Sequence, residues 1–164
     1  MSTVALVPIA EYLRRTEKPN CEYRDGALHP KAMPTSLHAW MQSLLIFLLT
    51  SRGKPALAEL TLRVTPSRFL IPDVAVVERL QFPYPTQAPE LCIEILSPDD
   101  SLQATLDKCQ EYHAWGVPTC WVIDPVKQKA WQSSAGSEAP LAIGTLHSGG
   151  LSLEINELFS ALPK

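Results

Sequence analysis

Apolar residues recur at helical spacing over residues 35–51. The pattern predicts a helix, because positions three and four residues apart lie on one helical face. Thr35 or Ser36 can cap its start, and Gly53 is expected to end it. Its apolar residues are Leu37, Trp40, Met41, Leu44, Leu45, Phe47 and Leu48.

A second helix is predicted to follow the turn SPDDSL at residues 97–102 and to end at Gly116. Its apolar stripe consists of Leu102, Leu106, Cys109 and His113. Residues 8–17 (PIAEYLRRTE) are expected to form a shorter helix that Pro8 opens, because the fixed φ of proline suits the first helical position.

Runs of apolar and β-branched residues predict the strands. CEYRDGALH, at residues 21–29, is expected to form a hairpin, because Asp25-Gly26 is a two-residue turn that favours positive φ. A polar stretch over residues 133–150 leads to a last strand or short helix near Leu162. Further strands are expected at residues 57–64, 69–78, 90–96 and 119–125, with 127–132 as the hairpin partner of the last. The order of elements predicts an α/β or α+β fold with a mixed sheet.

The composition fits one globular domain spanning residues 1–164. With 46% hydrophobic residues the chain is not of the disordered class. A formal net charge of −3 argues against general binding to bare nucleic-acid backbone, but it allows an enzyme that meets nucleic acid through one local patch.

The chain is expected to be cytoplasmic. Its longest apolar stretch, near residues 44–49, falls far short of the ~20 residues that cross a membrane, and MSTVALVPIAEYLRR has no basic region ahead of its apolar residues. The four cysteines form no C-x-x-C pair, so we expect them to be buried free thiols. The histidines show no metal-binding spacing, so a histidine-rich metal site is not expected.

Two carboxylates lie inside apolar strands, Asp73 in FLIPDVAVV and Glu94 in LCIEIL. Such a group is costly to bury unless it is paired, hydrogen-bonded or bound to a cation. If the two strands are neighbours, both oxygen-bearing side chains converge on one point, which suits Mg²⁺ or Mn²⁺. The carbonyl of Ile95 can add a third ligand.

Lys108 lies about two turns into the following helix, roughly 10 Å along its axis. Because that helix must run back across the sheet, the ammonium of Lys108 can meet the carboxylates. Two acids, a metal ion and a lysine can activate water against a phosphodiester.

The same residues also have structural interpretations. Asp73, after Pro72, can mark a bulge or accept from a neighbouring backbone N–H, and Glu94 with Lys108 can form a structural ion pair. Asp124 fits a strand-ending turn, and Glu22 and His38 fit surface or satisfied polar positions.

Three segments, IPDVAVV, ELCIEILSPDDS and LDKCQEYHAWGVPTCWVIDP, resemble the restriction-endonuclease branch of the PD-(D/E)XK nuclease superfamily, the Uma family. EYLRR, CEYRDGAL and TSLHAWMQSLL also resemble its pattern. The resemblance implies a restriction-endonuclease-like αβββαβ core, a mixed central sheet flanked by helices, with Asp73 and Glu94 as metal ligands. The superfamily's usual lysine position is Leu96 here, and the resemblance to this branch implies that the basic role lies on the helix, at Lys108. Glu22 matches an acidic family position and is an accessory candidate.

The chain also departs from the family pattern. Residues 99–107 (DDSLQATLD) lack the usual basic residues, Ala104 stands where an Asp is expected, and Ala27 replaces the acidic residue after the turn. These changes put DNA affinity and turnover in question.

We therefore expect a Mg²⁺- or Mn²⁺-dependent endodeoxyribonuclease. Asp73, Glu94 and the Ile95 carbonyl would hold the metal, and Lys108 would position or activate the attacking water. DNA is the expected partner, and a homodimer would cut both strands. The alternatives are a non-catalytic nuclease fold that binds nucleic acid or protein, and an enzyme acting on a small acidic or phosphorylated substrate.

Overall fold

The computed structural model of the protein describes residues 5–137 and 139–164. Residues 1–4, part of the segment for which we expect no secretion signal, lie outside these ranges. The helices are α1 (Ile9–Tyr12), α2 (Ser36–Ser51), α3 (Leu102–Trp115) and α4 (Ile155–Ser160). The strands are β1 (Cys21–Arg24), β2 (Ala27–Pro30), β3 (Ala56–Ala58), β4 (Leu62–Thr65), β5 (Arg68–Leu70), β6 (Val74–Val76), β7 (Leu91–Ile95), β8 (Thr119–Asp124), β9 (Lys129–Ser134), β10 (Thr145–Ser148) and β11 (Leu151–Glu154).

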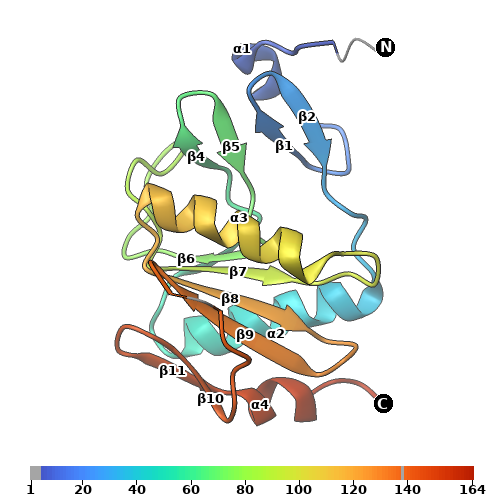
Figure 1. The fold of residues 1–164 in the computed structure, drawn as a ribbon, viewed down its shortest axis with the longest axis vertical. Coiled ribbons are helices and arrows are strands. Elements are labelled where there is room, and N and C mark those ends of the chain that lie inside the picture. Colours follow the sequence, from blue (N-terminus) through green and yellow to red (C-terminus); the bar gives the residue numbers. More distant parts are fainter. Residues whose placement is uncertain (1–4, 138) are drawn as a thin grey trace.

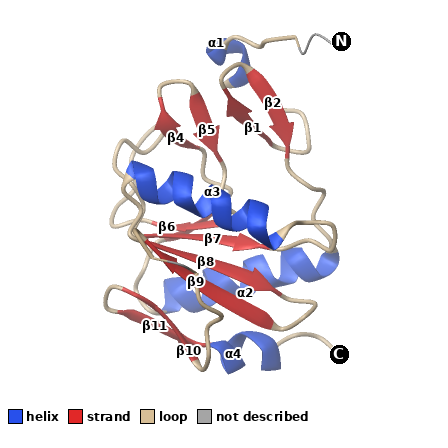
Figure 2. Cartoon of the chain, viewed as in Figure 1, coloured by secondary structure: helices blue, strands red, loops and turns tan. Residues whose placement is uncertain are grey.

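The central sheet has five strands in the order β3-β6-β7-β8-β9. β7 and β8 are parallel and the other neighbours are antiparallel, so the sheet is mixed. α2 covers one face and α3 the other, and a smaller sheet ordered β2-β1-β5-β4 lies next to α3 (Figures 1 and 2). This architecture confirms the predicted mixed sheet flanked by helices.

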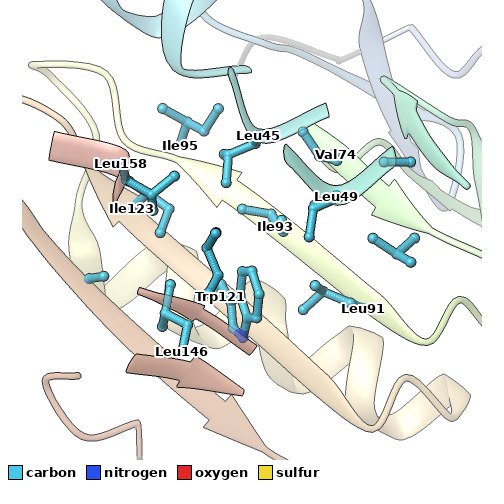
Figure 3. Packing of buried hydrophobic residues seen from close by; sticks show 14 of the residues in the cluster. Leu45, Leu49, Val74, Leu91, Ile93, Ile95, Trp121, Ile123, Leu146 and Leu158 are labelled. Carbon is cyan, nitrogen blue, oxygen red and sulfur yellow. The ribbon is translucent and has the colours of Figure 1, made fainter. Parts of the chain in front are cut away.

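The strand β7 is buried on both faces, as its continuous apolar pattern predicts. On one face, Leu91 and Ile93 pack with Leu45 and Leu49 of α2, around Trp121 of β8 (Figure 3). On the other face, the even-numbered positions pack against α3; the residues there include Cys92, Leu96, Cys109, Tyr112, Cys120 and Val122. Because successive side chains alternate, Glu94 belongs to the face that α3 covers.

Three predicted elements are too long. The expected helix at 8–17 is helical only over α1, and the expected strand at 57–64 is divided between β3 and β4. The expected strand at 69–78 is divided between the two sheets, with Asp73 in the connection between β5 and β6. Pro72 cannot donate to a strand ladder, so the break falls beside it.

The cysteines are free thiols, as expected, and Cys92, Cys109 and Cys120 are buried, whereas Cys21 is half-buried. At its C-terminal end the chain forms the hairpin β10–β11 followed by α4. The sequence predicts a last strand or a short helix; the chain has both, and β10 lies inside the stretch expected to be polar. None of the helices in the described ranges combines the length and apolar character that a membrane crossing requires.

The start of α2 gives a first prediction. The Thr35 side chain accepts from the His38 N–H at 3.2 Å, so Thr35→Ala should lower the free energy of unfolding by about 1 kcal/mol. Urea denaturation measures the change. Ser43→Ala, which removes an exposed hydroxyl in the same helix, is the matched control and should change stability by less than about 0.5 kcal/mol. An equal loss in both variants would contradict a capping role.

Candidate active site

Four segments of the chain bring acidic and basic side chains into one cleft. Val74 lies opposite Ile93 in the β6–β7 register. Asp73, just before β6, and Glu94, near the end of β7, are therefore neighbours. α3 crosses the face of β7 that carries Glu94 and presents Lys108 there. Glu22 reaches the same place from β1 of the smaller sheet. The cleft has a volume of about 330 Å³.

Lys108 joins two carboxylates. Its Nζ lies 2.8 Å from Glu94 Oε1 and 2.6 Å from Glu22 Oε1, and it donates to the Ile71 carbonyl at 3.4 Å. The contact with Glu94 is the expected one, but the second carboxylate is Glu22 rather than Asp73. Glu22 is therefore not a surface residue: it is buried and also accepts from the Ile71 N–H at 2.9 Å.

Asp73 has a different set of partners. Its Oδ1 accepts from Lys31 Nζ at 2.8 Å, and its Oδ2 accepts from the Ile95 N–H at 2.7 Å. His38 Nε2 lies 3.3 Å from the same Oδ2. Ile95 thus contacts Asp73 through its N–H, and the ligand role of its carbonyl stays a prediction.

The surroundings set the charge of each group. Burial raises the pKa of Asp73, but the His38 ring and the Lys31 ammonium outweigh it and hold that pKa well below its ordinary value. Burial raises the pKa of Glu94, against the opposing charge of Lys108. Burial lowers the pKa of Lys108, but Glu94 and Glu22 outweigh it and raise the pKa above its ordinary value, so Lys108 is an ammonium at neutral pH.

Tyr112 also contacts Glu94. It lies on α3, one turn after Lys108. Its hydroxyl donates to Glu94 Oε1 at 2.7 Å. Burial raises the pKa of Tyr112 well above its ordinary value, so the hydroxyl remains a donor. The closest contacts of Glu94 are thus made by Oε1, and Oε2 is the oxygen available to a ligand in the cleft.

Asp73 and Glu94 are oxygen donors of the kind that hard divalent cations such as Mg²⁺ prefer. Within residues 5–137 and 139–164, no cluster of three or more His, Cys, Asp or Glu side chains is arranged to hold a metal ion. Mg²⁺ does not need one, because it keeps several waters and binds proteins through one or two carboxylates together with substrate phosphates. Asp73 and Glu94 supply two carboxylates in one cleft.

Sequence reasoning missed several residues of the site. His38 was expected at a surface or satisfied position; it is buried beside Asp73, and its Nδ1 has no hydrogen-bond partner among the described residues. Gln42, one turn along α2, donates to the Asp73 carbonyl at 2.7 Å. His38 and Gln42 are four residues apart beside the apolar stripe of α2, and this spacing could have indicated that they share one site. Lys31 lies in a loop, where no periodic pattern could have indicated it.

Asp124 makes the strand-ending turn that was expected, accepting from two following N–H groups.

A mixed sheet between two helices, with one carboxylate just before β6, one in β7 and a lysine on the next helix, is the arrangement of a restriction-endonuclease-like fold. Residues 9–155 match the family described as "Uma2: Putative restriction endonuclease", and the chain belongs to this family. No protein with a curated description matches the chain.

The solved structures that are similar to the chain include the following two. One is the crystal structure of a "putative nuclease belonging to DUF820" from Anabaena variabilis, with a TM-score of 0.73 and 26% sequence identity over 94% of this chain and 98% of that chain. The other is a DrdV–DNA complex determined by electron cryomicroscopy, with a TM-score of 0.44 and 18% identity over 76% of this chain and 80% of that chain.

Proposed function

We propose that the protein is a metal-dependent endonuclease that hydrolyses phosphodiester bonds of DNA, with Mg²⁺ or Mn²⁺ as its cofactor. The observation that carries the proposal is the meeting of Asp73, Glu94 and Lys108 in one cleft. Membership of a family described as restriction endonucleases supports DNA as the substrate. The proposal includes a single nuclease domain over residues 1–164, a cytoplasmic location and a homodimer that cuts both strands.

Asp73, Glu94 and the Ile95 carbonyl would hold the metal. A divalent cation supplies Lewis-acid activation of water and of the phosphate when it is bound. Asp73 enters this role as a carboxylate, because its pKa is held low.

Lys108 has an electrostatic role in this proposal. As an ammonium it cannot take a proton from the attacking water, so of its two expected roles positioning is the better supported. It can donate a hydrogen bond and stabilise the negative charge that develops on the phosphate. Glu22 accepts from it and fixes its place, which makes Glu22 a positioning residue.

Cleavage of supercoiled plasmid DNA tests the proposal. The protein should nick or linearise the plasmid with Mg²⁺ or Mn²⁺ and leave it intact with EDTA. Calorimetry should show binding of Mg²⁺ in the absence of DNA. A protein that neither binds the metal nor cuts DNA would contradict the proposal.

A second candidate is a non-catalytic module that binds nucleic acid. It is favoured by Ala104, which lines the cleft where the family pattern has an acid. DNA binding without cleavage in any metal would support this candidate. Cleavage of short oligonucleotides or nucleotides in preference to plasmid would instead favour a small phosphorylated substrate.

A further inference from the structure

Lys31 lines the cleft beside Asp73. The residue follows β2, and its ammonium donates to the Ile71 carbonyl and to Asp73 Oδ1, both at 2.8 Å. Only 14% of its side chain is exposed. A largely covered cation is therefore paired with a carboxylate that the proposed function assigns to the metal.

The net charge around Lys31 favours a divalent ion that replaces its ammonium over one that binds beside it. We define the acid–lysine cluster as Glu22, Lys31, Asp73, Glu94 and Lys108. The formal charges of these three carboxylates and two ammonium groups sum to −1. Adding a divalent ion beside both lysines raises the sum by two, whereas exchanging Lys31 for that ion raises it by one, and the charge of His38 enters both cases equally. Buried charges are favourable only when they are compensated, so the exchange adds less uncompensated positive charge.

Other charged groups near the cluster leave this balance unchanged. Arg24 lies 3.6 Å from Glu22 Oε2, but it is also hydrogen-bonded to Glu111. Glu111 pairs in addition with Arg68, which pairs with Asp25, so these two arginines and two carboxylates compensate one another. Glu59 and Asp100 also line the cleft and are more exposed, so solvent screens them.

The geometry also selects Lys31 as the group that leaves. Asp73 Oδ2 is held by the backbone N–H of β7 and lies beside His38 on α2, both parts of rigid elements. Asp73 Oδ1 is held by a lysine, which has a flexible four-carbon stem and can swing into the cleft.

We propose that Lys31 is the internal counter-ion of the metal-free site, and that its ammonium and a divalent cation compete for Asp73 Oδ1. The inference rests on the proposed function, because it takes Asp73 as a metal ligand. Lys31 then stabilises the Asp73 carboxylate when no metal is bound, and it lowers the apparent affinity for the metal.

Calorimetric titration of Mg²⁺ into the full chain tests the competition. Lys31→Gln removes the charge and keeps a donor for the Ile71 carbonyl; it should bind Mg²⁺ on the order of tenfold more tightly than the wild type. Lys31→Arg keeps the charge and should bind no more tightly than the wild type. Lys54→Gln is the matched control: Lys54 pairs with Glu90 at 2.9 Å, does not line the cleft, and its loss should leave the affinity unchanged.

The wild-type protein offers a second test that needs no variant. Acetylation of Lys31 by acetic anhydride, measured by peptide mass spectrometry, should be slow without metal and rise several-fold with saturating Mg²⁺. Lys54 reports any general change in reactivity and should be modified equally in both conditions.

The outcomes separate this inference from the proposed function. Equal or weaker Mg²⁺ binding by Lys31→Gln, or unchanged acetylation of Lys31, overturns the competition; if the wild type still binds Mg²⁺, the proposed function stands. Absence of Mg²⁺ binding in both the wild type and Lys31→Gln overturns the two together.

Discussion

Glu94→Gln is expected to reduce DNA cleavage on the order of 10³-fold, because it removes the charge of a proposed metal ligand while keeping the shape of the side chain. The amide oxygen can still accept from Tyr112, whose hydroxyl lies 2.7 Å from Glu94 Oε1. Rates of plasmid cleavage at saturating Mg²⁺ measure the change.

The matched control for Glu94→Gln is Asp124→Asn. Asp124 is equally buried at the end of the neighbouring strand β8, and its hydrogen bonds to the N–H groups of Val126 and Lys127 can be kept by the amide oxygen. This variant should cleave at the wild-type rate. Wild-type cleavage by Glu94→Gln would remove Glu94 from the catalytic machinery.

Lys108→Met is expected to lower the free energy of unfolding by roughly 3–5 kcal/mol, because it leaves two buried carboxylates without their shared cation. Glu22 and Glu94 both lie within 2.8 Å of the Lys108 ammonium, and both are 7% exposed. Urea denaturation without metal measures the loss. Lys127→Met, at a side chain 72% exposed, should change stability by less than about 0.5 kcal/mol.

A double variant separates charge from packing at the same place. Glu22→Gln combined with Lys108→Met removes one of the two carboxylate charges that have lost the Lys108 ammonium, so it should recover part of the stability that Lys108→Met loses. If the double variant were less stable than Lys108→Met, the loss would come from packing of the lysine stem instead of from the unpaired carboxylates.

The contact between Glu94 and Lys108 could be predicted because two periodicities determine it. Alternation in a strand gives the face of Glu94, and the return of the following helix across that face brings Lys108 over it. Both rules act within one strand–helix unit, and the contact is present in the structure.

The partners of Asp73 could not be predicted in the same way. Lys31 follows a hairpin of the smaller sheet, and its sequence separation from Asp73 is 42 residues. His38 meets Asp73 only because α2 packs against the opposite face of the central sheet from α3. These contacts depend on how separate elements dock, which no local periodicity specifies. The division of the expected strand at 69–78 has the same origin, since Pro72 excludes a continuous strand but does not indicate that its halves join different sheets.

The connection between the two sheets makes the site sensitive to partial opening of the protein. Glu22 and Lys31 belong to the hairpin side, whereas Glu94 belongs to the central sheet, and the segment Ile71–Asp73 links them through shared hydrogen bonds. If the smaller sheet separated locally, the cluster would come apart while the core around Trp121 stayed intact. Amide hydrogen exchange in the smaller sheet and loss of the proposed activity should therefore report the same local opening. A molecule whose central sheet is still folded can then already be inactive.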